Sequence, residues 1–233
     1  PEGEIRLAME SDTVTQDFHF KFNSDIDPLA IRPAFREEKQ QQALDHFFFG
    51  KPPDVEGEIW GRWREQDRTG FRASVLARDF SVRGQHYDEG RAGLEFTNSL
   101  LVATNAFASR PEGEATANGI GYDFKSKFIY LTNAVGRLDP VVVTSSIGPK
   151  TARALEPYQF LEPPHVEVNG FAQTGRGTNK LADLRFKVVG GAFRYWKFNA
   201  KKIAGDVHWK NQSVILTNIV TEFYGGELRG RLR

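Results

Sequence analysis

The stretch DFHFKFN, Asp17 to Asn23, alternates polar and apolar residues with a period of two. Its phenylalanines, Phe18, Phe20 and Phe22, therefore lie on one face of an extended chain and its polar residues on the other, as in a strand buried on one side. The same alternation recurs in VEGEIWGRW at 55–63, FRASVLA at 71–77 and LRFKV at 184–188. This period predicts antiparallel strands that share one apolar face. Turn-rich clusters, REQDRTG at 64–70 and TGRGTNK at 174–180, separate the strands.

Landmarks in the first half of the chain return in the second half in the same order. PEGE at Pro1 returns at Pro111, and the Asp-Pro pair at Asp27 returns at Asp139. Further matches, 111 to 113 residues apart, are AL at Ala43 and Ala154, Phe49 and Phe160, PP at Pro52 and Pro163, and TN at Thr104 and Thr217. Composition alone does not explain this order. The chain is therefore interpreted as two repeats, 1–110 and 111–223, with YGGELRGRLR at 224–233 opening a third.

Each repeat carries one stretch of good helix formers after its second strand. REEKQQQALDHF predicts a helix at about 33–48, and PKTARALEPYQF predicts one at about 149–160. A Pro-Pro pair follows each stretch and stops the helix. No Gly/Ser/Pro-rich linker joins the repeats. We therefore predict a mostly β chain whose tandem repeats of antiparallel strands form one elongated curved sheet, a continuous module with one short helix per repeat.

Catalytic and metal-binding patterns are weak in this sequence. The five histidines lie on different segments without the spacing of a metal site. Asp25 and Asp27 resemble an acid/base pair, but Asp27 precedes a proline as Asp139 does, which favours a helix cap. The net charge is only +1, and the phenylalanines alternate along strands, which argues against nucleic acid as a partner. We predict a non-enzymatic protein without a cofactor or a metal.

Charge is distributed unevenly along the chain. Residues 1–110 hold 14 Lys/Arg and 19 Asp/Glu, net −5, and the remainder hold 17 and 11, net +6. Drift between duplicated repeats is one explanation, and attraction of the basic half to anionic lipid headgroups is the other. No run of 18 apolar residues occurs, and the sequence starts without Met or a leader pattern. We expect an internal piece of a longer protein.

Short glycine-containing strands carry a resemblance to a known family. YGGELRG at Tyr224–Gly230, GEIWG at Gly57–Gly61, GIGYDF at Gly119–Phe124 and the recurring DP-helix-F-PP-V-E segment resemble bacterial AsmA and TamB-type proteins, the bridge-like lipid transfer family with a repeating β-groove. The resemblance implies a periplasmic location in a Gram-negative envelope, with membrane attachment through a segment outside this chain. It also implies phospholipid transport between the inner and outer membranes, with proteins of both membranes as partners at the ends of the full-length protein.

An apolar trough shields acyl chains without any catalytic group, at about 0.8 kcal/mol per buried methylene. The residues predicted to line this lipid groove are apolar and alternate along the strands: Phe18, Phe20, Phe22, Ile59, Trp63, Phe71, Val75, Leu94, Phe128, Tyr130, Val166, Val168, Leu184, Phe186 and Val188. Two alternatives stay open. A structural or interaction scaffold would fill the same face with a dry packed core, and a hydrolase or glycan-binding protein would carry a polar cleft with convergent carboxylates.

Overall fold

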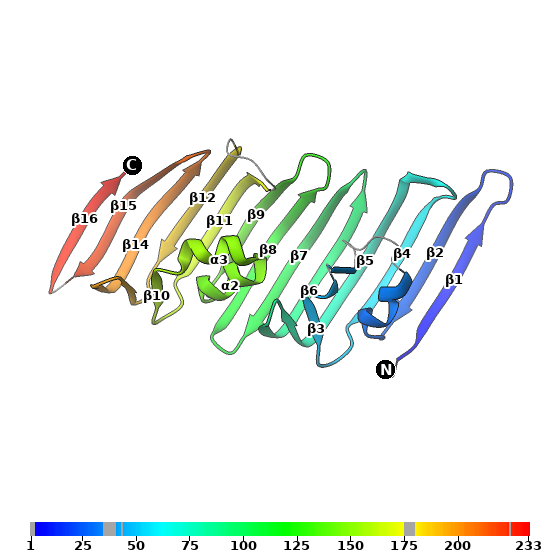
Figure 1. The fold of residues 1–233 in the computed structure, drawn as a ribbon, viewed down its shortest axis with the longest axis horizontal. Helices are drawn as coiled ribbons and strands as arrows, with labels where there is room; N and C mark the ends of the chain where they lie inside the picture. Colours follow the sequence, from blue (N-terminus) through cyan, green and yellow to red (C-terminus); the bar gives the residue numbers. More distant parts are fainter. Residues whose placement is uncertain (1–2, 35–40, 43, 175–179, 224) are drawn as a thin grey trace. The chain divides into compact units, whose positions relative to one another are not determined.

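The computed structural model describes residues 3–34, 41–42, 44–174, 180–223 and 225–233. Sixteen strands form one antiparallel sheet in the order β1-β2-β4-β5-β6-β7-β8-β9-β11-β12-β14-β13-β10, with β15 beside β14, β16 beside β15 and β3 beside β5 (Figure 1). The predicted class, a mostly β chain in one antiparallel sheet with few short helices, is confirmed.

Equivalent elements follow one another in the same order and at a similar spacing in the two halves of the chain. The first seven strands are β1 (Ile5–Ser11), β2 (Asp17–Ser24), β3 (Phe47–Phe49), β4 (Asp54–Arg62), β5 (Glu65–Val82), β6 (Gln85–Thr97) and β7 (Leu100–Arg110). The others are β8 (Gly113–Asp123), β9 (Phe128–Gly136), β10 (Tyr158–Phe160), β11 (His165–Gln173), β12 (Ala182–Val189), β13 (Phe193–Tyr195), β14 (Phe198–Lys210), β15 (Ser213–Phe223) and β16 (Gly226–Leu232). The start of β10 follows that of β3 by 111 residues, and β15 follows β7 by 113.

The contacts divide the chain into two compact units. The first unit comprises Pro1–Ser109 with Gly121–Lys125, and the second comprises Arg110–Ile120 with Ser126–Arg233. The first extends from β1 to β7, and the second contains β9 to β16.

Helical segments follow the second strand of each half, at bounds that differ from the prediction. A 3₁₀ helix, η1 (Pro28–Ala34), starts after Asp27, whose carboxylate accepts a hydrogen bond from the Leu29 amide at 2.9 Å. The predicted helix at 33–48 is wrong at its end, because Phe47 already pairs with Val82 as part of β3. Gln41, Gln42 and Leu44, within the predicted range, are helical, and residues 35–40 and 43 lie outside the described residues.

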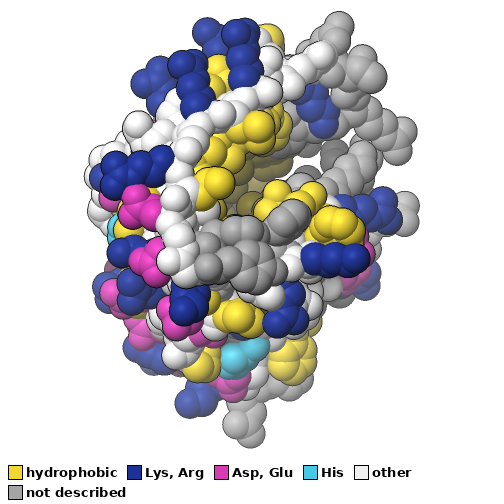
Figure 2. All heavy atoms as spheres, turned by 90° about the vertical axis from the view of Figure 1, so that its left-hand side faces the viewer, with side chains coloured by type: hydrophobic (Ala, Val, Ile, Leu, Met, Phe, Trp, Pro, Cys, Tyr) yellow, Lys and Arg dark blue, Asp and Glu magenta, His cyan; other side chains and the backbone are white. Residues whose placement is uncertain are grey.

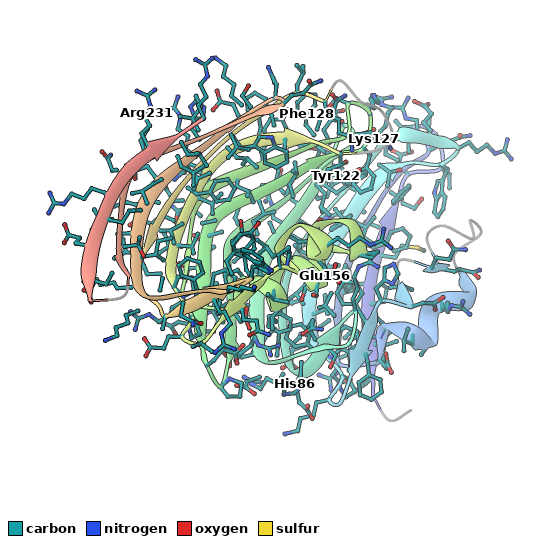
Figure 3. The ribbon with its side chains drawn as sticks, turned by 60° about the vertical axis from the view of Figure 1, so that its left-hand side comes forward. His86, Tyr122, Lys127, Phe128, Glu156 and Arg231 are labelled. Carbon is teal, nitrogen blue, oxygen red and sulfur yellow. The ribbon has the colours of Figure 1, made fainter. Side chains whose placement is uncertain are left out.

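The second half has two short helices in place of the single predicted one. α2 (Pro140–Ile147) begins after Asp139, which accepts a hydrogen bond from the Val141 amide at 2.8 Å, so the predicted cap is confirmed. Gly148, at φ 153°, separates it from α3 (Pro149–Leu155). The predicted helix at 149–160 is wrong beyond Leu155, because Tyr158–Phe160 form β10 on β13. Both helices lie over one face of β9 and β11 (Figures 1 and 3).

Asparagines at positive φ interrupt the alternation of three strands. Asn105, Asn133 and Asn218 have φ between 46° and 53°, and the strand pairing shifts by one residue at each of them. Each follows a threonine. Such bulges place two residues opposite one on the neighbouring strand, and asparagine tolerates the left-handed conformation they need.

The predicted turn at 64–70 is much tighter in the structure. Arg62 pairs with Glu65 and Trp60 with Gly70, so most of REQDRTG belongs to β5. The equivalent cluster TGRGTNK at 174–180 falls mainly on 175–179, outside the described residues. In addition, the three-residue strands β3, β10 and β13 were not predicted; their aromatic residues stack across strands, as Phe49 does on Phe80 and Tyr158 does on Tyr195.

Few large side chains are buried within the described part of either unit. Its buried hydrophobic residues are Ala73, Ala77, Tyr87, Ala117, Leu138, Ala172, Ala182, Leu184 and Ala200. Six of these nine are alanines. Pro53 and Pro164, from the two Pro-Pro pairs, are the largest fully buried side chains. The apolar face of each unit therefore keeps most of its large side chains at a partly exposed surface, and Leu184 is an exception.

Candidate apolar binding surface

The apolar face of the first unit consists of rows of side chains that run across neighbouring strands. In an antiparallel sheet, directly paired residues point to the same face. One row joins Met9, Phe20, Ile59, Phe71 and Phe96 through the pairing of β1, β2, β4, β5 and β6. The next row joins Leu7, Phe22, Gly57, Ala73 and Leu94, and a third joins Ile5, Ser24, Val55, Val75 and Ala92. The pairing thus gives one face three adjacent rows that are apolar except for Ser24.

Aromatic side chains cluster at the hairpin end of these rows. The ring centroids of Phe18 and Phe20 are 5.3 Å apart, and Trp63 lies 4.6 Å from Phe18 and 6.1 Å from Phe20. The Trp63 Nε1–H donates to Ser11 Oγ at 3.2 Å, which satisfies the polar atom of the indole. All eight residues predicted to line the groove in the first repeat lie on this face, either within the rows or in this aromatic cluster.

Large side chains of this face remain partly open to solvent. Leu7 and Met9 are 60% and 61% exposed and Trp63 is 48% exposed. Phe18, Phe20, Phe22, Ile59 and Phe71 are of intermediate exposure. The small residues Gly57 and Ala73 lie between these bulkier side chains and leave the middle row shallow. An atom added to Gly57 as Cβ would lie 2.8 Å from the Ala73 Cβ and 2.5 Å from the Arg72 carbonyl oxygen. The site is therefore an open apolar surface and not a closed cavity.

The opposite face of the first unit carries charged side chains in alternating sign. His19 Nε2 lies 2.9 Å from Glu58 Oε2, and Arg72 lies between Glu58 and Glu95 at 3.9 and 3.6 Å. Farther along β5, Arg78 lies 3.6 Å from Asp54 and 3.8 Å from Glu89. Each exposed pair contributes little to stability. Their joint effect is to keep this face hydrated, so that the two faces of the sheet differ sharply in polarity.

The second unit repeats the two-faced arrangement. One row joins Val168, Phe186, Val207, Leu216 and Leu232, and the next joins Gly170, Leu184, Trp209 and Val214. Ala172, Ala182 and Leu184 are buried here, with Ile129, Leu131, Val168 and Phe186 packed against them. Viewed from the side of β16, hydrophobic side chains gather on the inner wall of a hollow, and charged side chains lie outside it (Figure 2). Val166 and Val188 pair on the same face, so five predicted lining residues of this repeat share it.

Phe128 and Tyr130 do not belong to this face, and their prediction as lining residues is wrong. Tyr130 pairs with Phe171, and Phe128 with Gln173, whereas Leu131 pairs with Gly170 and Ile129 with Ala172 of the apolar row. The rings of Phe128, Tyr130 and Phe171 instead form a cluster on the opposite face, 5.7 to 6.3 Å apart. In FIYL, four consecutive apolar residues give no alternation from which the face could be read.

Several residues of the apolar faces were missed by the prediction. In the first unit they include Leu7, Met9 and Phe96, and in the second Val207 and Leu216. IRLAM at 5–9, where Arg6 separates Ile5 from Leu7, was the available signal in the first unit. VIL at 214–216 is continuously apolar and gives no alternation. Neighbouring-strand pairing is needed to choose a face in such stretches.

The polar features of the described residues are a concavity and several groups with shifted pKa values. A concavity of about 710 Å³ lies against the charged face of the first unit, where Lys21, Glu56, Glu58 and Arg72 contribute side chains. Hydrogen bonding from Arg62 lowers the pKa of Asp17, and His208 lowers the pKa of Asp183 in the same way. Burial, and then Tyr195, raises the pKa of Tyr158. In the described segments no group of three or more His, Asp or Glu is placed to hold a metal ion.

Comparisons with protein-family models, with curated proteins and with solved structures found no match to this chain. Over the residues that the structure describes, no helix combines the length and apolar character needed to cross a bilayer.

Proposed function

We propose that this protein is a non-enzymatic segment that shields phospholipid acyl chains on its apolar faces. The observation that carries the proposal is the set of apolar rows, whose large side chains, such as Met9, Phe20 and Phe71, remain partly exposed. Contiguous exposed apolar surface on a folded protein commonly marks a binding site. An acyl chain laid across such rows buries both its own methylenes and the protein's phenylalanine and leucine side chains.

The energetics favour a long flexible ligand over a compact one. Each methylene removed from water contributes about 0.8 kcal/mol, so affinity grows with the length of chain in contact. The rows provide apolar contact from β1 to β6 in the first unit, and from β11 to β15 in the second. Because neighbouring rows lie side by side on one face, a chain can move from one to the next without full exposure of its methylenes to water. No chemical step is required for this function.

The biological setting follows from the resemblance to AsmA and TamB-type proteins. We propose that the segment lies in the periplasm of a Gram-negative envelope and conducts phospholipid between inner and outer membranes, with proteins of those membranes at the ends of the full-length molecule. The glycine-containing strands GEIWG and GELRG, in β4 and β16, support this assignment at the level of sequence.

Substitution of Phe20 tests the proposal. The purified chain is analysed by native mass spectrometry for co-purified phospholipid. We expect bound phospholipid on the unaltered chain and its loss in Phe20→Asp, because a carboxylate at the centre of the apolar row is strongly unfavourable beside an acyl chain.

Asn23→Asp is the matched control, since it introduces the same carboxylate on the same strand but on the charged face, opposite Arg6 and Glu56. Both variants are first compared with the unaltered chain by circular dichroism. Equal phospholipid content in Phe20→Asp and Asn23→Asp, or an unaltered chain free of lipid after exposure to phospholipid vesicles, would contradict acyl-chain binding. A lipid-free chain would favour a scaffold role.

A further inference from the structure

The second unit has one edge at which several strands turn or end. Strand pairing places Phe128 beside Gln173, Ala182 beside Ala172, Lys210 beside Ser213, and Leu232 beside Leu216. The β8–β9, β11–β12 and β14–β15 connections and the end of β16 therefore lie along the same edge (Figure 1). This edge is called the hairpin edge below.

Cationic side chains are concentrated at the hairpin edge of the second unit. They are Lys127, Lys180, Lys210, Arg231 and Arg233, named here the basic rim. Figure 3 shows Lys127 and Arg231 at this upper edge and Glu156 away from it, and Figure 2 shows Lys and Arg side chains gathered at the upper rim of the hollow. Among the described residues, no ion pair within 4.0 Å involves any of the five.

Two carboxylates lie at or next to this edge, and both are already engaged. Asp123, at the end of β8, accepts a hydrogen bond from the Lys125 amide at 2.7 Å. Asp183 pairs in register with Lys210, but its Oδ1 is 2.9 Å from His208 Nε2 and 3.7 Å from Arg185 Nε. The other acidic side chains of this part of the sheet, such as Glu222 and Glu227, pair near the opposite end of β15 and β16. The rim therefore presents a net positive charge to solvent.

Exposed apolar side chains alternate with these cations. Leu181 is 53% exposed, Val214 45%, Leu232 62% and Trp209 39%. The Trp209 Nε1–H donates to the Asn211 carbonyl oxygen at 2.7 Å, so the indole is held at the tip of the β14–β15 hairpin with its polar atom satisfied. Tryptophan and aliphatic residues between lysines and arginines are typical of surfaces that insert into the headgroup region of a bilayer.

The equivalent edge of the first unit lacks this character. Its hairpin residues include Asp12, Asp17 and Glu65 together with Arg62 and Arg68. Here the charges pair with one another: Arg62 Nε lies 2.9 Å from Asp17 Oδ1, and Arg68 NH1 lies 3.4 Å from Glu65 Oε2. The two units thus have hairpin edges of the same construction. The edge of the first unit has opposite charges that pair, and the edge of the second unit is basic.

We propose that the basic rim of the second unit docks on the surface of a membrane that contains anionic phospholipid. Its cations face the headgroups, and Leu181, Trp209, Val214 and Leu232 enter the interfacial region. Nucleic acid fits the rim less well, because three of the four exposed apolar side chains between the cations are aliphatic and offer no ring on which a base could stack. The nearby rings of Phe128, Tyr130 and Phe171 pack on one another.

Trp209, Val214 and Leu232 are also the residues of the apolar rows nearest this edge. Docking through the rim cations does not require an acyl chain in the rows, so it does not depend on the proposed acyl-chain binding.

Vesicle co-sedimentation tests the inference with the full chain. Vesicles of phosphatidylcholine with phosphatidylglycerol are compared with vesicles of phosphatidylcholine alone, at low and high salt. We expect binding only to the anionic vesicles and its decrease with salt. Each neutralised rim cation should weaken partition about fivefold, so Lys127→Gln, Lys210→Gln and Arg231→Gln together should weaken it on the order of a hundredfold.

The matched control removes three positive charges from the hairpin edge of the first unit, by Arg62→Gln, Arg64→Gln and Arg68→Gln. It has the same net charge as the rim variant, and we expect it to bind anionic vesicles like the unaltered chain. Equal losses in the two triple variants would overturn the inference in favour of general charge attraction. Equal binding to both vesicle types would also overturn it, as would binding of a single-stranded oligonucleotide in preference to anionic vesicles. Phe20→Asp should leave this docking unchanged, which separates it from acyl-chain binding.

Discussion

Asparagine after threonine has one conformational role throughout the described sheet. Asn105, Asn133 and Asn218 lie at bulges with positive φ, and Asn98, in a fourth Thr-Asn pair, lies at φ 51° in the β6–β7 turn. Neighbouring side chains support two of the bulges: Asn169 Oδ1 accepts from the Asn133 amide at 2.7 Å, and Asn218 Nδ2 donates to Asp206 Oδ2 at 2.6 Å. The extra residue lets Leu216 and Ile219, three apart, pair with Leu232 and Gly230 on one face.

Replacing Asn105 tests the importance of this conformation. Asn105 is exposed and has φ 49°, a region in which a β-branched side chain is strongly disfavoured. We expect Asn105→Val to lower the free energy of unfolding by about 1–2 kcal/mol, measured by urea denaturation. Asn105→Gly is the control and should cost less, because glycine adopts positive φ freely. A valine variant as stable as the glycine variant would show that the bulge is not needed.

At the scale of elements, the helices of both halves begin in the same way although their lengths differ. Asp27 and Asp139 each accept a hydrogen bond from the amide two residues later. α2 is only eight residues long, none of them fully buried. A helix this short depends strongly on its cap, because few intrahelical hydrogen bonds hold it.

Removal of the Asp139 carboxylate should therefore loosen α2. We expect Asp139→Ala to destabilise the helix by about 1 kcal/mol, seen as faster hydrogen exchange of the Val141 and Val143 amides. Asp139→Asn retains a side-chain oxygen for the Val141 amide and should exchange nearly as slowly as the unaltered chain. If the alanine variant exchanged no faster than the asparagine variant, the cap would have no role in holding α2.

The positions of the strands could be predicted from the sequence. The face to which each side chain points, and the residues at which the helices end, could not always be predicted. DFHFKFN and LRFKV alternate cleanly, and both lie in strands with the predicted faces. FIYL does not alternate, and only its pairing with β11 shows that Ile129 and Leu131 lie on the apolar face. The predicted helices overran into Phe47 and Tyr158, because helix propensity does not register the cross-strand partners Val82 and Tyr195. Long-range pairing decided each of these cases.

At the scale of the whole molecule, the first and last strands each have only one partner within the described sheet. β1 pairs with β2 and β16 with β15, and all residues of both are exposed. Leu228 and Leu232 are 56% and 62% exposed on β16. A strand with a free row of amides and carbonyls beside exposed leucines can pair with another chain.

We expect the purified chain to self-associate through these free edges. Sedimentation velocity should show an average mass that rises with protein concentration. Leu228→Lys with Leu232→Lys should reduce association, because charges on an edge strand oppose pairing. Val14→Lys, at a residue 88% exposed in the β1–β2 turn, is the control and should associate like the unaltered chain. An unaltered chain that stays monomeric at every concentration would contradict the prediction.

The prevalence of alanine among the buried residues determines how this protein tolerates mutation. A buried leucine or phenylalanine normally makes truncation the damaging change, since its removal leaves a void. Truncation of alanine removes only one methyl group. A side chain at Gly57 would lie within 2.5 Å of the Arg72 carbonyl oxygen, and Ala73 is 6% exposed and leaves little room for a larger side chain. We therefore expect the fold to tolerate truncation of the large side chains that already border solvent. We expect it to be destabilised by substitutions that add even one carbon atom at the small residues between the strands.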